Sequence, residues 1–148
     1  MKSSINGPGH DGGPLDASGV LAGFLASLET FEPDEILPWF HSDAVIEFPF
    51  AVEGRPKRYE GTAELTTFFK WAAQVFSTIS FLDVQVWPLA DPSMALGEFR
   101  SSGVLARSLV PFGNSYIVTA TARDGRLSTY REFYDPQAVI RAAGGGRV

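Results

Sequence analysis

The side chains that could carry acid–base chemistry gather around one carboxylate near the C-terminal end of the chain. Glu132 alternates with Tyr130 and Tyr134 on one face of the last expected strand. If that face points inward, the charged carboxyl loses hydration among aromatic rings and its pKa rises, which suits general acid chemistry near neutral pH. If it points outward, Glu132 is a solvated side chain or an ion-pair partner of Arg131 or Arg100. Neither face is purely apolar, so periodicity leaves both alternatives open.

Three other polar side chains could assist such a site. Tyr116 could donate a hydrogen bond to a ligand carbonyl or to Glu132, although a buried tyrosine is commonly structural. Asn114 could contact a ligand or hold the end of a strand. His41 follows a short expected helix, where it could satisfy the terminal carbonyls. It is a candidate second proton carrier only if it faces a cavity.

Composition excludes several other chemistries. The chain has 148 residues, no cysteine and two histidines, which rules out thiolate nucleophiles and Cys-based clusters and argues against a histidine-built metal centre. We therefore expect no metal and no cofactor.

The net charge of −5 and the lack of a basic run argue against nucleic acid as a partner. No segment reaches the roughly 18 apolar residues of a membrane span, so we expect no membrane association and a cytoplasmic protein.

Apolar periodicity predicts helices first and an antiparallel meander last. The first fourteen residues contain no apolar stretch and are expected to form a disordered leader, 1–14, before a single domain over 15–148. The expected elements are helices at 18–31 and 33–38, a strand at 43–50, a loop at 53–61, a helix at 62–76, strands at 79–87, 94–107, 112–123 and 127–134, and a helix at 136–144. This order indicates an α+β fold, in which a sheet curled around helices leaves a cavity on its concave side.

Four segments carry a resemblance to a known family. They are DAVIEFPFAVEG at 43–54, RYEG at 58–61, the pair Asn114 and Tyr116, and YREFYDP at 130–136. Together they resemble SnoaL-like proteins of the nuclear-transport-factor-2-like superfamily, and the closing segment is most similar to the phenazine-biosynthesis A/B branch. The resemblance implies a cone-like, cystatin-like roll, in which a curved antiparallel sheet wraps around three N-terminal helices and a short C-terminal helix follows.

The resemblance also implies where acid–base chemistry would lie. In the ketosteroid-isomerase branch the catalytic base is an Asp just before the proline of the first segment, and this chain has Phe48 there, which cannot take a proton. In the phenazine A/B branch the acid–base residue is the glutamate of the closing motif, which corresponds to Glu132. The expected pocket wall consists of Phe48, Phe69, Trp71 and Tyr130, with Asn114 as a polar contact, although such rings are more commonly core filler than specific ligand contacts.

Three functional hypotheses follow. The first is a cofactor-independent isomerase, cyclase or condensation-type enzyme acting on a cyclic, largely apolar carbonyl metabolite, with Glu132 as general acid or base and Tyr116 or His41 assisting. The second is a non-catalytic binding module for an aromatic metabolite, and the third is a scaffold for association. A long meander leaves one sheet face uncovered, which favours a homodimer. Burial of Glu132 beside a void would favour the enzyme.

Overall fold

The computed structural model describes residues 16–144, and the expected leader lies outside them. The described residues form helices α1 (Ala17–Ser27), α2 (Pro33–Ile36), α3 (Gly61–Val75) and α4 (Pro136–Ala142), with short 3₁₀ turns at Leu28–Thr30 and Leu37–Trp39. The strands are β1 (Phe40–Glu47), β2 (Arg58–Glu60), β3 (Phe76–Pro88), β4 (Met94–Leu105), β5 (Pro111–Arg123) and β6 (Arg126–Tyr134). The predicted α+β class is confirmed.

All six strands form one sheet in the order β2-β1-β6-β5-β4-β3. Four of the neighbouring pairs are antiparallel, but β1 and β6 run parallel, so the sheet is mixed where a purely antiparallel one was expected. Strand β2 lies inside the segment predicted to be a loop and pairs Tyr59 with Ile46 of β1. Three residues at a sheet edge are too few to show an alternating pattern, which explains the error.

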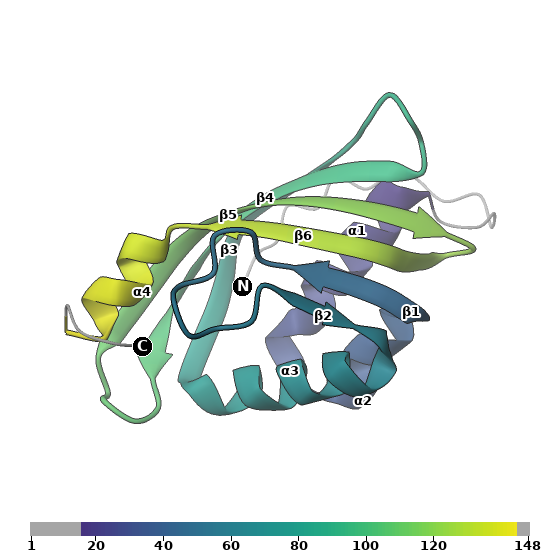
Figure 1. Cartoon of the computed structure of the whole chain (residues 1–148). Coiled ribbons are helices and arrows are strands. Elements are labelled where there is room, and N and C mark those ends of the chain that lie inside the picture. Colours follow the sequence, from purple (N-terminus) through teal and green to yellow (C-terminus); the bar gives the residue numbers. More distant parts are fainter. Residues whose placement is uncertain (1–15, 145–148) are drawn as a thin grey trace.

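The sheet curves around the helices on one side (Figure 1). Helix α1 packs against β3, β4, β5 and β6, while α3 packs against β1, β2 and β3. The α1 side chains Val20, Leu21 and Phe24 are almost fully buried, as expected for a helix enclosed by a concave sheet. Gly23 allows the close approach of Trp39, because a Cβ atom at this position would overlap the indole ring.

The C-terminal end of the fold is held by two side chains. Asp135 caps α4 by accepting a hydrogen bond from the Gln137 amide at 2.9 Å. The Asn114 side chain on β5 donates to the Asp135 carbonyl at 3.0 Å and accepts from the Asp135 amide at 2.9 Å. These bonds fix α4 at the end of β5 and β6, where it closes one side of the cavity described next.

Candidate functional site

A cavity of about 210 Å³ lies between the concave sheet face, α3, α4 and the loop that follows β1. Its wall is mostly apolar and rich in aromatic rings. The polar or charged residues in this wall are Arg55, Tyr59, Asn114, Tyr116, Glu132 and Tyr134. We call it the main cavity. An apolar wall with a few polar groups is typical of small-molecule sites.

A second cavity of about 110 Å³ lies against the core and reaches Phe24 and Leu28 near the end of α1. We call it the inner cavity. It shares five lining residues with the main cavity: Phe48, Phe68, Phe76, Tyr116 and Glu132. Glu132 therefore borders both spaces.

Strand β6 turns Glu132 toward the cavities. Arg131 and Phe133 point to the opposite face, where the Arg131 guanidinium lies 3.4 Å from the Glu47 carboxylate. On the concave face the Tyr130 hydroxyl donates to Oε1 of Glu132 at 2.8 Å. The alternative of a Glu132 paired with Arg131 is thus excluded by the geometry, because the two side chains leave the sheet on opposite sides.

The environment of Glu132 favours its neutral form. Burial raises the pKa of the Glu132 carboxyl from 4.5 to about 7, and the hydrogen bond from Tyr130 opposes this rise as the smaller effect. Glu132 is partly exposed, as its position on the walls of both cavities requires. At neutral pH both protonation states are populated.

Two tyrosines beside Glu132 are hydrogen-bond donors that stay neutral. Tyr130 is 3% exposed and packs edge-on against Phe24 with ring centroids 5.0 Å apart. Burial raises the pKa of Tyr130, as does the nearby Glu132 charge. The Tyr116 ring stacks on Phe99, its hydroxyl lies 2.8 Å from Ser101 Oγ, and burial likewise raises its pKa. Neither phenol ionises near neutral pH.

The expected wall residues divide between the two cavities. Phe48 borders both cavities and packs against Phe68 with ring centroids 5.1 Å apart. Phe69 and Tyr130 line the inner cavity. Trp71 lies at the edge of the main cavity and is 40% exposed. Asn114 lines the main cavity, but both ends of its amide are used by the backbone of Asp135 and Ser115, which makes it a structural residue.

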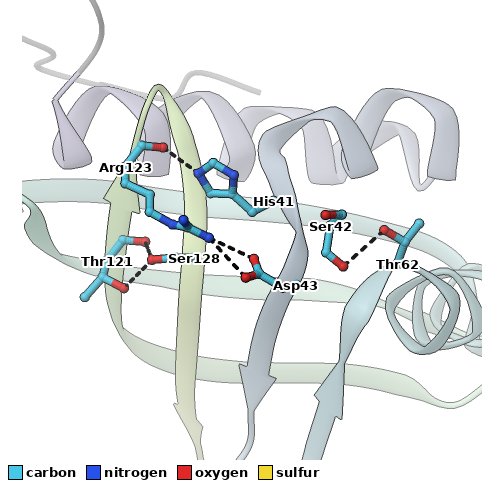
Figure 2. Close-up of polar contacts among 7 residues, drawn as sticks. All are labelled: His41, Ser42, Asp43, Thr62, Thr121, Arg123 and Ser128. Carbon is cyan, nitrogen blue, oxygen red and sulfur yellow. Dashed lines mark hydrogen bonds and ion pairs between the residues drawn. The ribbon is translucent and has the colours of Figure 1, made fainter.

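The His41 side chain points toward the backbone of Arg123 (Figure 2). It is the second residue of β1 rather than part of a helix end, and its Nε2 lies 2.6 Å from the carbonyl oxygen of Arg123 at the β5–β6 turn. Arg123 in turn forms an ion pair with Asp43 at 2.9 Å. His41 lines neither the main nor the inner cavity. The role of second proton carrier was expected only if His41 faced the cavity, and its ring is instead bound to the β5–β6 turn.

Several residues of the site were not predicted. Tyr134 lines the main cavity, and its alternation with Glu132 was a usable signal; its hydroxyl lies 3.3 Å from the Val52 amide. Arg55 comes from a loop without periodicity, so no pattern in the sequence marks it.

Within residues 16–144, no cluster of three or more histidine or acidic side chains could hold a metal ion. No helix in that range is long and apolar enough to cross a membrane.

Comparison with known proteins identifies the family. No protein-family model matches the sequence. The chain is 33% identical over 131 residues to an uncharacterised PhzA/B-like protein of Pseudomonas aeruginosa, with 88% of this chain and 92% of that protein covered. The chain belongs to the PhzA/B-like family. The expected similarity of the chain to the phenazine-biosynthesis A/B branch is thereby confirmed.

Solved structures agree with the PhzA/B-like assignment. A Bacillus subtilis protein provisionally named an isomerase is 33% identical, with a TM-score of 0.78 and coverage of 88% of this chain and 94% of that one. A nuclear-transport-factor-2-like protein of Burkholderia xenovorans has the same fold at 18% identity, with a TM-score of 0.69 and coverage of 83% and 92%. The PhzA/B-like chain thus has the nuclear-transport-factor-2-like fold expected from its sequence.

Proposed function

We propose that this PhzA/B-like protein is a cofactor-independent enzyme of the isomerase, cyclase or condensation type, acting on a cyclic, largely apolar carbonyl metabolite. The observation that carries the proposal is a carboxyl, Glu132, enclosed in an apolar cavity with a pKa of about 7. A group with that pKa can remove a proton from a carbon next to a carbonyl and return it, since both of its forms are populated at neutral pH.

Tyr116 is the group best suited to assist. Proton removal beside a carbonyl places negative charge on the carbonyl oxygen, and a neutral hydroxyl donor stabilises that charge. Ser101 Oγ and the Tyr116 hydroxyl lie 2.8 Å apart, and either can donate to the other. When Ser101 donates, the Tyr116 proton is available to the substrate. Ser101 is 4% exposed, so its hydroxyl has few competing partners.

The position occupied by Phe48 limits the mechanism. Phe48 is buried between the rings of Tyr59 and Phe68 and adds apolar surface where related isomerases place an acid. Glu132 is the one acidic residue among those that line the main cavity. We infer that a single carboxyl both accepts and donates the proton, which suits a transfer within one substrate molecule.

A binding module without turnover is the second candidate. It uses the same apolar cavity, and the full use of the Asn114 amide by the backbone leaves few polar groups for chemistry. Turnover separates the two candidates, because a binding module retains affinity for flat cyclic ligands without converting them.

We also propose a homodimer that forms through the outer sheet face. This face and the adjoining loop expose Ile117 at 50% and Phe50 at 57%, and Phe50 packs against Phe133 with ring centroids 5.4 Å apart. Exposed apolar surface of this kind favours a two-fold contact. Analytical ultracentrifugation at micromolar concentration should give twice the chain mass of 16.0 kDa, and a monomer would contradict the proposal.

The test of the enzyme proposal begins with a thermal-shift screen of cyclic ketones and flat aromatic acids, because a ligand that binds the native state raises the melting temperature. Compounds that bind are then assayed for conversion by wild type, Glu132→Gln and the control Glu47→Gln. Glu47 lies on the outer face, paired with Arg131. We expect Glu132→Gln to retain binding and to lose about a hundredfold to ten-thousandfold in turnover. Equal turnover in Glu132→Gln and wild type would remove Glu132 from the mechanism.

A further inference from the structure

A thin wall separates the main cavity from the surface of the protein. On the outer side of this wall, a groove of about 850 Å³ runs between the β1–β2 loop and α4. Ala51 and Val52 line both this outer groove and the main cavity. Figure 1 shows the loop extending beyond β1 and β2 toward α4. The loop therefore has the main cavity on one side and an open groove on the other.

The second half of this loop, residues 52–56, folds as a unit of its own, which we call the flap. The Arg55 amide donates to the Val52 carbonyl at 3.0 Å and closes a turn in which Gly54 has a φ of 89°. A type II turn requires a positive φ at this position, and glycine adopts it without strain. Among residues 16–144, no backbone hydrogen bond joins the flap to residues outside it. The flap can thus move without disrupting the sheet.

The base of the loop is fixed more firmly than the flap. The Phe48 amide donates to the Lys57 carbonyl at 2.8 Å, and the Ala51 amide donates to the Phe48 carbonyl at 3.0 Å. The Phe50 ring packs against Phe133 on the outer face, with ring centroids 5.4 Å apart. The two ends of the flap, next to Ala51 and Lys57, are therefore the positions at which it can pivot.

Two contacts across the cavity hold the flap in place. The guanidinium carbon of Arg55 lies 3.5 Å from the centroid of the Trp71 ring on α3, and the Val52 amide donates to the Tyr134 hydroxyl on β6 at 3.3 Å. Arg55 forms no ion pair with an acidic side chain of residues 16–144. Its hydrogen bond to Tyr59 is long, at 3.4 Å, and stays within the adjoining strand β2. Cation–π contacts and long hydrogen bonds are individually weak, so the flap can be released while the base stays folded.

We propose that residues 52–56 are a lid on the main cavity, that the stack of Arg55 on Trp71 is its latch, and that a ligand enters and leaves when the latch opens. This inference rests on the proposed small-molecule function of the cavity. An opening flap moves Val52 toward the outer groove and connects the cavity with solvent. A closed flap excludes water from the space beside Glu132, which strengthens electrostatic interactions with a bound ligand.

The movement of the flap is measured by NMR amide exchange in wild type, Arg55→Gln and the control Arg58→Gln. Opening breaks the hydrogen bond of the Val52 amide and leaves the hydrogen bonds of the Phe48 and Ala51 amides intact. The Val52 amide therefore reports on the flap, and the other two amides report on the base of the loop. Arg58 is the matched control, because it is exposed and its ion pair lies outside the flap.

In Arg55→Gln we expect the Val52 amide to exchange about twofold to fivefold faster, the factor that corresponds to losing a cation–π contact at a partly exposed site, because exchange follows the population of the open state. The Phe48 and Ala51 amides should keep their wild-type rates, as should all three amides in Arg58→Gln. An unchanged Val52 rate in Arg55→Gln would overturn the latch. An equal acceleration at Phe48 and Ala51 would mean that the whole loop unfolds and would overturn the flap.

The passage of a ligand is measured by stopped-flow fluorescence with prodan, a neutral bicyclic ketone. The latch is closed in both the free and the ligand-bound protein, so Arg55→Gln should raise the association and dissociation rate constants by the same factor and leave the equilibrium affinity unchanged. Faster Val52 exchange with unchanged rate constants would refute the flap as the entry route. A change in affinity through the dissociation rate constant alone would make Arg55 a ligand contact and would refute the latch.

Failure of the proposed function gives a different result. A wild-type protein that does not bind prodan counts against a cavity for flat cyclic ketones. The exchange rate of the Val52 amide is measured without any ligand, so it still confirms or refutes the flap in that case.

Discussion

Replacing Glu132 by Gln should change how the stability of the protein depends on pH. The pKa of Glu132 is raised to about 7 in the folded state, whereas the unfolded chain is expected to have the ordinary value of 4.5. The stabilising contribution of the protonated carboxyl is therefore fully present below pH 4.5 and is lost as pH rises through about 7. Glutamine has no such dependence, since it does not titrate.

The structure sets the size of the effect. Moving the pKa from 4.5 to about 7 corresponds to a free energy of about 3 kcal/mol over the whole titration. Between pH 5.5 and 8.5, a range that stays above the isoelectric point of about 4.9, the expected change is about 2 kcal/mol. Wild type should lose this amount relative to Glu132→Gln as pH rises.

The assay is urea unfolding of both proteins at several pH values in this range. Other titrating groups are common to the two proteins, so their contributions cancel in the difference between the two free energies of unfolding. Glu47→Gln serves as the control, because Glu47 lies on the outer face, where its carboxylate is 3.4 Å from the Arg131 guanidinium. A constant difference between wild type and Glu132→Gln would refute the reasoning, since it would mean that Glu132 titrates alike in the folded and unfolded chains.

Three further predictions concern Tyr130, Asn114 and His41. Tyr130→Phe removes the donor to Oε1 and should raise the pKa of Glu132 further, moving the pH-dependent loss of stability to higher pH; an unchanged position would mean that the hydrogen bond does not favour the carboxylate. Asn114→Ala should cost about 1–3 kcal/mol in urea unfolding by leaving the Asp135 amide without its partner, and a smaller loss would show that water replaces it. His41→Gln should leave the affinity for a ligand found in the thermal-shift screen unchanged by calorimetry, and a large change would place His41 in the site.

Local patterns predicted the parts of the fold that local interactions specify. The Asp124-Gly125 turn was expected from its residue types, and both residues have positive φ values of 51° and 75°. The first strand was expected to continue to Phe50, but it ends at Glu47. The Phe48 amide donates instead to the Lys57 carbonyl at 2.8 Å and brings the chain back toward β2.

Long-range pairing accounts for what the sequence did not reveal. The parallel contact between β1 and β6 joins residues such as Ile46 and Tyr130, which are far apart in the chain and show no local sign of each other. The direction of Glu132 depends on that same pairing, because polar residues occupy both faces of β6. Arg55 reaches the cavity from an irregular loop, and only the folded chain shows that it stacks on Trp71.

The central claim is that Glu132 carries a proton inside the cavity near neutral pH, and its most direct test is a carbon-13 NMR titration of the glutamate carboxyl groups. The Glu132 signal is assigned as the one absent from Glu132→Gln. We predict that this carboxyl titrates near pH 7, well above the ordinary glutamate value of 4.5. Titration of Glu132 near pH 4.5 would contradict the account, because a carboxyl that is fully ionised at neutral pH cannot serve as its proton donor.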